Sequence, residues 1–315
     1  MRFLKLTFLT SLFILLIIGC KQENELKQQT GFLAVNGGKV WYRVTGNGSK
    51  TPILMLHGGP GYPSHYFNPL LEIGKERPVI TFDQLGCGRS DRITDTTLMT
   101  VDSYIEQTKE LLDHLGVKEF YLYGHSWGTM LGTDYYLKHP EGIKALILAS
   151  PCLSVKKWVS DADSLISTLP DSVSVVLRNS VNGVSQDSLT SATAIEHYFA
   201  NFYHRKNPQS ADLDSAGAQM GLSVYVHMWG TNEFISTGNL KNYDRTTDLK
   251  NISVPTLYVT GEFDAAPPST VKYYQSLTPN SKLVIIPGAG HMTMHDNPAE
   301  DIKVISEFLN VVDNN

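Results

Sequence analysis

Short apolar segments that alternate with amphipathic ones are the feature that most constrains the fold of this 315-residue chain. The apolar segments are rich in β-forming residues and are bounded by Gly, Asn and Pro, which is typical of strands. We expect eight strands, at 32–35, 40–44, 53–56, 79–82, 120–123, 145–149, 256–259 and 283–286. Helical periodicity falls between them, most clearly at 101–115. Strands that alternate with helices predict an α/β fold with a mostly parallel sheet.

The alternation stops after Ser150-Pro151 and resumes near 256. The stretch between them has helix-like segments without a convincing strand, and one of these, 187–203, carries an aromatic face. A helical insertion of this kind commonly covers a pocket at the carboxyl ends of the strands. We therefore assign 31–151 and 249–315 to an α/β core and 152–248 to a helical cap.

The N-terminal residues are typical of an export signal. Arg2 and Lys5 precede an apolar run at 6–18, which is too short to span a bilayer comfortably. Ile17-Ile18-Gly19-Cys20 is similar to a bacterial lipobox, in which the Cys is acylated and becomes the mature N-terminus. We predict a lipoprotein-type signal peptide at 1–19, lipidation of Cys20 and a polar tether at 20–30. The protein would then be exported and held on a bacterial membrane by its lipid alone; an ordinary cleaved signal is the alternative.

Charge and cysteine usage narrow the class of protein further. The formal net charge is −5 and no Lys/Arg cluster is present, which argues against a nucleic-acid partner. Cys87 and Cys152 follow the predicted fourth and sixth strands, roughly 14 Å apart. A disulfide needs Cα atoms within about 7 Å, so we expect two free thiols.

The run Gly124-His125-Ser126-Trp127-Gly128 lies between an expected buried strand and an expected helix at 129–138. A Gly-x-Ser-x-Gly run in this position forms the strained turn that exposes a nucleophilic serine in the α/β-hydrolase fold. The positive end of the following helix favours developing negative charge. We therefore predict Ser126 as the nucleophile of an α/β-hydrolase.

A catalytic serine needs a general base, and the base needs an acid that orients it. In this fold they follow in the order Ser, acid, His. Asp264 and His291 each follow a predicted strand, so they lie at strand ends as Ser126 does, and we predict them as acid and base. Glu262 is the rival acid and His295 the rival base; their alternative places are a solvated loop and the start of the last helix.

Two backbone amides are candidates for the oxyanion hole. One is the N–H of Trp127, directly after the nucleophile. The other comes from the run at 57–61, His-Gly-Gly-Pro-Gly, where glycine lets the backbone approach a substrate closely; we select Gly59. We expect His57 to support this loop by hydrogen bonding.

Three motifs resemble the proline iminopeptidase (prolyl aminopeptidase) family: His-Gly-Gly-Pro-Gly at 57–61, Asp-Gln-Leu-Gly-Cys-Gly-Arg-Ser at 83–90 and Gly-His-Ser-Trp-Gly at 124–128. The resemblance runs from about 32 to 309, cap included. The stretch 228–234, Met-Trp-Gly-Thr-Asn-Glu-Phe, is similar to the cap segment of the tricorn-interacting aminopeptidases. That resemblance implies that Glu233 binds the free α-amine of a substrate.

Two features qualify the resemblance. Relatives carry a second Glu directly after the triad Asp, whereas this chain has Ala265, so amine recognition could be weaker, could use Glu262 or could be lost. A solvated acidic side chain on a cap helix is the alternative for Glu233. In the 83–90 loop we expect Asp83 and Arg89 to form an ion pair. The cap aromatics are expected mainly in the core, with one or two lining an apolar pocket: Tyr198, Phe199, Phe202, Tyr203, Tyr225 and Trp229.

These observations predict an exported serine aminopeptidase that removes an N-terminal residue, preferably proline, from short peptides through an acyl-enzyme. It would need no metal or organic cofactor, and no oligomeric state is predicted. An esterase, lactonase or amidase on the same scaffold is the nearest alternative, because a fold and a nucleophile do not specify a substrate. A non-catalytic surface lipoprotein is the more distant one.

Overall fold

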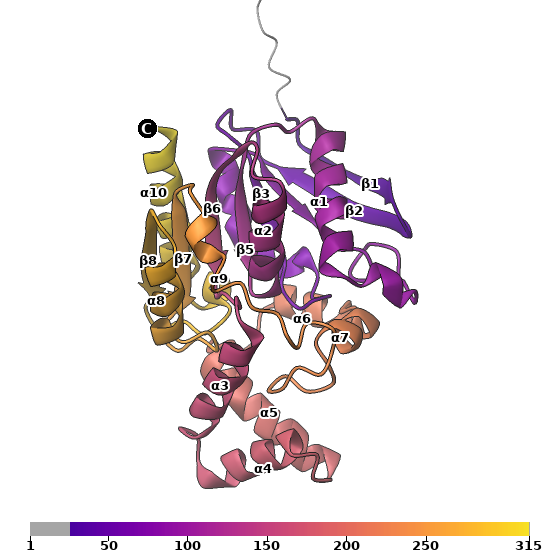
Figure 1. Cartoon of the computed structure of the whole chain (residues 1–315), viewed down its shortest axis with the longest axis vertical. Helices are drawn as coiled ribbons and strands as arrows, with labels where there is room; N and C mark the ends of the chain where they lie inside the picture. The colour runs from indigo at the N-terminus through magenta and orange to yellow at the C-terminus, as the bar shows by residue number, and fades with distance from the viewer. Residues whose placement is uncertain (1–25, 315) are drawn as a thin grey trace, which may run out of the picture.

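An eight-stranded sheet forms the centre of the protein in a computed structural model, which describes residues 26–314 (Figure 1). The strand order is β1-β2-β4-β3-β5-β6-β7-β8. β2 pairs antiparallel with β1 and β4, and the remaining neighbours are parallel, which confirms the predicted mostly parallel sheet. The strands are β1 (Gln29–Val35), β2 (Gly38–Thr45), β3 (Ile53–Leu56), β4 (Val79–Phe82), β5 (Phe120–His125), β6 (Ile143–Ala149), β7 (Thr256–Gly261) and β8 (Ser281–Ile286).

Helices cover both faces of the sheet because its central strands are apolar on both sides. Alternate residues of β3 and β4 belong to two separate core clusters, one on each face. The first cluster includes side chains of α1 (Val101–Leu115), α2 (Trp127–Lys138) and α8 (Pro268–Leu277). The second includes side chains of the 3₁₀ helix η1 (Ser64–Lys75) and of α10 (Pro298–Asp313). Short helical turns complete the core: η2 (Thr96–Leu98), η3 (Leu249–Asn251) and α9 (Thr293–Asp296).

Five helices lie between β6 and β7, in the region assigned to the cap. They are α3 (Val155–Ile166), α4 (Asp171–Val181), α5 (Ser188–Phe202), α6 (Ala211–Ala218) and α7 (Leu222–Met228). Figure 1 shows α3, α4 and α5 projecting from one end of the sheet, with α6 and α7 beneath the strands. α6 packs against the core helix η1, where Asn68 donates to Asp212 at 2.6 Å.

The N-terminal boundary of the core differs from the prediction. β1 begins at Gln29, so the last two residues of the predicted tether belong to the sheet. Polar side chains are compatible with a strand here because β1 is an exposed edge strand whose backbone pairs with β2, Gln29 opposite Val44. The predicted signal peptide at 1–19, Cys20 and residues up to 25 lie outside the described residues. Within 26–314, no helix combines the length and apolarity needed to cross a bilayer.

Cys87 and Cys152 are both buried and unpaired, which confirms the prediction of two free thiols. The strands that precede them, β4 and β6, are three strands apart in the sheet order. Burial raises the pKa of each thiol well above its usual value, so neither is a reactive thiolate.

Candidate active site

Ser126 lies on a strained turn between β5 and α2, with φ 55° and ψ −119°. The residues two positions before and after it, Gly124 and Gly128, must be glycine because backbone atoms crowd the turn. A Cβ at Gly128 would lie 2.0 Å from Leu56 O, and one at Gly124 would lie 2.3 Å from Gly128 O. This crowding holds Ser126 at the carboxyl end of β5, the geometry that the Gly-x-Ser-x-Gly run predicts.

His291 and Asp264 meet at the same end of the sheet. His291 Nδ1 and Asp264 Oδ1 are 2.7 Å apart, and both side chains are almost fully buried. Ser150, directly after β6, donates from Oγ to Asp264 Oδ2 at 2.6 Å. Burial acts to raise the pKa of Asp264, but the charge and hydrogen bond of His291 and the other donors outweigh it and lower that pKa. Asp264 is therefore an ionised acceptor that fixes the orientation of the imidazole.

The rival acid and base are occupied elsewhere. Glu262 accepts a hydrogen bond from Gly288 N at 2.9 Å in an exposed loop. His295 is bonded through both ring nitrogens, to Ser210 Oγ at 3.0 Å and to Tyr66 O at 2.8 Å. The sequence-based preference for Asp264 and His291 over these two residues agrees with the geometry.

A buried hydrogen-bonded chain links the nucleophile turn to the loop of the base. Gly58 N donates to Tyr66 Oη at 2.6 Å, and Tyr66 Oη lies 3.0 Å from His125 Nδ1. His125 Nε2 lies 2.9 Å from His291 O. Burial and the neighbouring His291 lower the pKa of His125 to about 3, so its ring stays neutral and can donate from Nε2 while accepting at Nδ1. Among the described residues no hydrogen bond joins Ser126 to His291; contacts of this kind often tighten only with substrate bound.

The amides of Gly59 and Trp127 are placed to serve as oxyanion donors. Both residues line a pocket with Ser126. Neither N–H donates a hydrogen bond to any described residue, so both can receive an acceptor from a substrate. His57 supports the loop as expected: its Nδ1 lies 2.9 Å from Gly58 O, and its Nε2 accepts from Gln84 N at 2.9 Å. Burial lowers the pKa of His57 to about 4, which keeps it neutral.

Glu233 faces the same pocket as Ser126. It follows α7 in a loop, so the alternative of a solvated acid on a cap helix is wrong. Tyr203 donates from its hydroxyl to Glu233 Oε1 at 2.5 Å, and Tyr225 donates to Oε2. Burial raises the pKa of Glu233, although both hydroxyls act to lower it. Glu233 is thus a partly buried carboxylate held by two neutral hydroxyl donors, and among the described residues no Lys or Arg forms an ion pair with it.

The pocket that contains Ser126 and Glu233 has a largely apolar wall. Glu233 is the one carboxylate among its lining residues; Ala265 is buried and does not line it. Seven apolar or sulfur-bearing residues line it: Pro60, Trp127, Met130, Cys152, Trp158, Trp229 and Leu240. A single charged group in an apolar pocket is suited to bind one small cation.

The cap aromatics divide between packing and the site. Tyr198 and Phe202 are buried in the core, and Trp229 lines the pocket as the prediction allowed. Sequence reasoning missed the hydroxyl partners of Glu233, as well as Tyr66, Ser150 and Trp158. A signal existed for Ser150, which follows a strand end directly; Tyr203 and Tyr225 lie 30 and 8 residues from Glu233, separations that no local pattern links.

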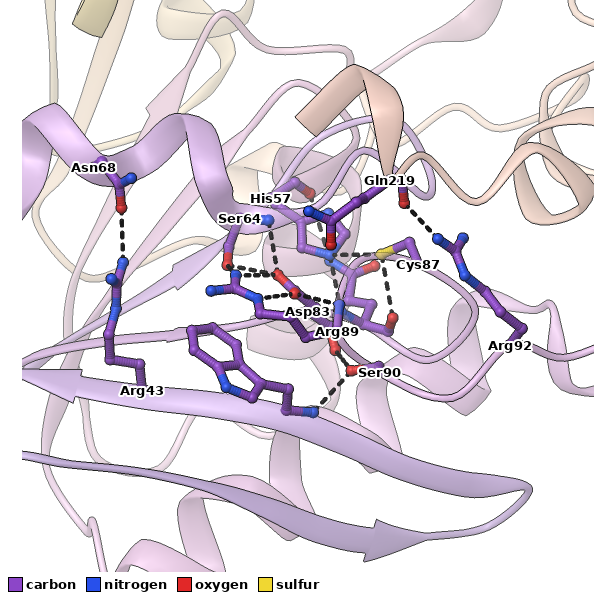
Figure 2. A network of polar contacts seen from close by, with 12 residues as sticks. Arg43, His57, Ser64, Asn68, Asp83, Cys87, Arg89, Ser90, Arg92 and Gln219 are labelled. Atoms are coloured by element: carbon purple, nitrogen blue, oxygen red, sulfur yellow. Dashed lines mark hydrogen bonds and ion pairs between the residues drawn. The ribbon is translucent and has the colours of Figure 1, made fainter. Parts of the chain in front are cut away.

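The 83–90 loop is braced as expected. Figure 2 shows Arg89 against Asp83, with Nε 2.7 Å from Oδ2 and Nη2 3.0 Å from Oδ1. The guanidinium also lies over the Trp41 ring, 3.2 Å from its centroid. Burial acts to raise the pKa of Asp83, but Arg89 and Ser64 outweigh it and lower that pKa. This network positions the 83–90 loop, and within that loop the Gln84 N–H donates to His57 Nε2. In the described part of the chain, no three His, Cys, Asp or Glu side chains are grouped as metal ligands.

Comparisons with known proteins agree with this architecture. Residues 51–298 match the family model of the alpha/beta hydrolase fold, so the chain belongs to the α/β-hydrolase family and is a hydrolase by class. A proline iminopeptidase of Heyndrickxia coagulans is 41% identical over 285 residues, which cover 90% of this chain and 99% of that protein. One from Clostridioides difficile is 33% identical over 293 residues, or 91% of this chain and 100% of that protein.

A solved structure gives the same result. The crystal structure of the proline iminopeptidase of Mycobacterium smegmatis matches with a TM-score of 0.85 at 26% identity, covering 90% of this chain and 99% of that chain. Within the α/β-hydrolases, the chain belongs to the proline iminopeptidase family.

Proposed function

We propose that this protein is a serine aminopeptidase that releases an N-terminal residue, preferably proline, from short peptides through an acyl-enzyme. The observation that carries the proposal is Glu233, a partly buried carboxylate that faces the pocket of Ser126 and, among the described residues, forms no ion pair with Lys or Arg. An aminopeptidase must fix an ammonium group one residue from the scissile carbonyl, and a carboxylate does so by a charge-assisted hydrogen bond. A hydrolase of neutral esters has no use for such a group.

The mechanism follows from the placement of the side chains. Ser126 attacks the scissile carbonyl while His291 takes its proton, and Asp264 stabilises the charged imidazole. The N–H groups of Gly59 and Trp127 stabilise the oxyanion, at about 3 kcal/mol for each donor. His291 then protonates the leaving amine, and water repeats the sequence on the acyl-enzyme. The apolar wall accepts the pyrrolidine ring of an N-terminal proline.

Comparison of a proline arylamide with its N-acetylated form tests the proposal. We expect the free-amine substrate to have a kcat/KM at least about 100-fold higher, because the acetylated form leaves Glu233 buried without a cation. Equal turnover of the two substrates would sink the aminopeptidase assignment and favour an esterase, lactonase or amidase.

A pair of variants assigns the effect to one carboxylate. Glu233→Gln should lower kcat/KM for the proline arylamide by about 100-fold, because a neutral amide cannot pair with the ammonium. Glu262→Gln is the matched control, since Glu262 lies in an exposed loop bonded to Gly288, and it should keep wild-type kinetics. Labelling of Ser126 by a neutral fluorophosphonate should persist in both; its absence in folded wild-type protein would instead revive the non-catalytic alternative.

We also propose that the protein is exported and lipid-anchored through Cys20. The support is the sequence alone: basic residues, an apolar run and the lipobox-like Ile17-Ile18-Gly19-Cys20. Wild-type protein expressed in bacteria should incorporate a radioactive fatty acid and sediment with membranes, and Cys20→Ala should do neither. Cys87→Ala, which alters a buried thiol, is the control. Equal fatty-acid labelling of the wild type and Cys20→Ala would contradict the anchor.

A further inference from the structure

Tyr203, at the end of cap helix α5, contacts both chemical halves of the site. Its hydroxyl donates to Glu233 Oε1 at 2.5 Å. Its ring lies against the imidazole of His291, with centroids 4.8 Å apart and planes inclined by 47°. Its carbonyl accepts a hydrogen bond from Met292 N at 2.8 Å, directly after the base. One residue of the cap therefore touches the amine-binding carboxylate, the imidazole and the backbone that carries the imidazole.

Phe202, the residue before Tyr203, connects the same end of α5 to the loop of Asp264. Phe202 O accepts from His291 N at 2.9 Å and from Ala265 N at 3.1 Å. The loops after β7 and β8, which carry Asp264 and His291, are thus both tied to the end of α5. Tyr203 is therefore held by backbone bonds as well as by its side chain, and its ring and hydroxyl have little freedom to move relative to the base.

Tyr225 shows that this arrangement is specific to Tyr203. Its hydroxyl donates to the other oxygen of Glu233. Among the described aromatic contacts, however, the tyrosine ring against His291 is that of Tyr203; Trp158 and His125 form the other walls. Tyr225 contacts only the carboxylate of these two groups, whereas Tyr203 contacts both the carboxylate of Glu233 and the imidazole of His291.

Aminopeptidase geometry requires such a connection. The substrate ammonium and the scissile carbonyl are joined through one Cα, so their separation is fixed. The enzyme must hold its carboxylate and its base at a matching separation, and a misplacement of about 1 Å can cost about 100-fold in rate. A rigid aromatic side chain with a polar tip can set such a separation, because the ring packs on one group while the hydroxyl bonds the other.

We infer that Tyr203 is a positioning residue that couples amine recognition to the catalytic base by holding Glu233 and His291 in one rigid unit. This inference rests on the proposed function, since it takes Glu233 as the group that binds the substrate amine. The hydroxyl and the ring have separable roles. The hydroxyl serves substrates with a free amine, whereas the ring serves every reaction of Ser126 that uses His291.

Two variants separate these roles, each measured by kcat/KM for a proline arylamide and by the rate constant for labelling of Ser126 with a neutral fluorophosphonate. Tyr203→Phe keeps the ring and should lower the ratio of amine turnover to labelling rate about tenfold, the effect of one hydrogen bond to a charged group. Tyr203→Leu removes the ring as well and should label about tenfold more slowly than Tyr203→Phe, because the imidazole loses one wall. Phe199→Leu is the control, since Phe199 packs on the Tyr203 ring at 4.5 Å from the same helix without lining the pocket.

Three results would overturn the coupling while leaving the proposed function intact. The first is a wild-type ratio in Tyr203→Phe, and the second is equal labelling of Tyr203→Phe and Tyr203→Leu. The third is a loss of both the turnover-to-labelling ratio and the labelling rate in Phe199→Leu. That result would show that the losses come from disturbed packing of the cap. Thermal melting of each variant checks folding, and Tyr203→Phe decides the hydroxyl role even if Tyr203→Leu does not fold. A wild-type protein that leaves the proline arylamide intact would overturn the proposed function and the coupling with it.

Discussion

The carboxyl group of Glu233 illustrates how single residues acquire their chemistry from distant neighbours. Its two oxygens are bonded to hydroxyls from α5 and α7, and its surroundings are largely apolar. Burial makes the charged form costly, so the pKa of Glu233 lies above its usual value. The carboxylate is therefore a group whose charge is poorly compensated until a cation arrives, which favours binding of an ammonium.

The raised pKa of Glu233 predicts a specific pH dependence. The carboxylate binds an ammonium only when ionised, so amine recognition is present above its pKa and lost as pH falls through it. We expect the ratio of proline arylamide turnover to fluorophosphonate labelling to fall at a higher pH than the ordinary Glu value of about 4.3. The ratio isolates amine recognition from effects that both reactions of Ser126 share.

Tyr225→Phe tests whether Glu233 causes this fall of the ratio at low pH, which is the acid limb of the pH profile. Removal of a hydroxyl that lowers the pKa of Glu233 should move the limb to higher pH. Glu233→Gln should abolish the limb. A limb that is unchanged in Glu233→Gln would show that another group titrates.

At the scale of elements, the short helix α9 joins the cap to the loop of the base. Asp296 in α9 accepts hydrogen bonds from Arg205 N and Lys206 N of the cap, at 2.9 and 3.1 Å, and from Gly290 N at 2.8 Å. Burial acts to raise the pKa of Asp296, but His204 and these amides outweigh it and lower that pKa. An ionised Asp296 thus holds Gly290, the residue before His291, close to Arg205 and Lys206, which follow α5.

The neighbouring helix α10 contains a buried acid without such compensation. Asp301 accepts from Thr293 Oγ1 at 2.9 Å, and its other oxygen has no partner among the described residues. Burial raises the pKa of Asp301 to about 7. The folded chain therefore keeps a proton that the unfolded chain releases near pH 4, so stability falls as pH rises from about 4 to 7 and levels off above it.

Asp301→Asn should remove this dependence. The amide oxygen still accepts from Thr293 but carries no charge, so we expect the free energy of unfolding at pH 8 to rise by about 2 kcal/mol and to change little at pH 4. Urea unfolding at the two pH values measures the difference. Asp163→Asn, at an exposed acid of α3, should show no such gain, and a destabilised Asp301→Asn at pH 8 would contradict the argument.

At the scale of the whole molecule, an ion pair joins the end of α10 to the segment just before β4. Arg77, just before β4, is 1% exposed and lies 2.6 Å from Asp313 at the end of α10. Tyr121 of β5 donates to the same carboxylate at 2.6 Å. These contacts link residues 236 and 192 positions apart, so they tie the last helix to the core.

Asp313→Ala should therefore destabilise the protein by about 3 kcal/mol, because it leaves the buried Arg77 guanidinium without its carboxylate and with Thr51 O as its remaining hydrogen-bond acceptor among the described residues. At about 2 °C per kcal/mol for a domain of this size, thermal melting should shift down by roughly 6 °C. Glu300→Ala breaks a largely exposed pair with Lys303 on the same helix and should cost less than about 1 kcal/mol. Equal effects of the two variants would show that Arg77 is solvated when unpaired.

Features that depend on local pattern were predictable from the amino-acid sequence. Apolar runs predicted the strands, the glycines around Ser126 predicted the turn, and strand ends predicted where Asp264 and His291 lie. Each of these follows from neighbours within a few residues, where sterics and burial act directly. The extent of β1 was missed because edge pairing, rather than side-chain polarity, decides that strand.

The contacts between the cap and the core were not predictable from local sequence and are known from the tertiary structure. Tyr203 and Tyr225 reach Glu233 from different helices, and Phe202 O binds the loops that carry the acid and the base. These contacts join residues that are distant in the sequence and follow no period. They arise because helices of the cap pack over the sheet, and packing depends on shape and on polar groups that find partners once water is excluded.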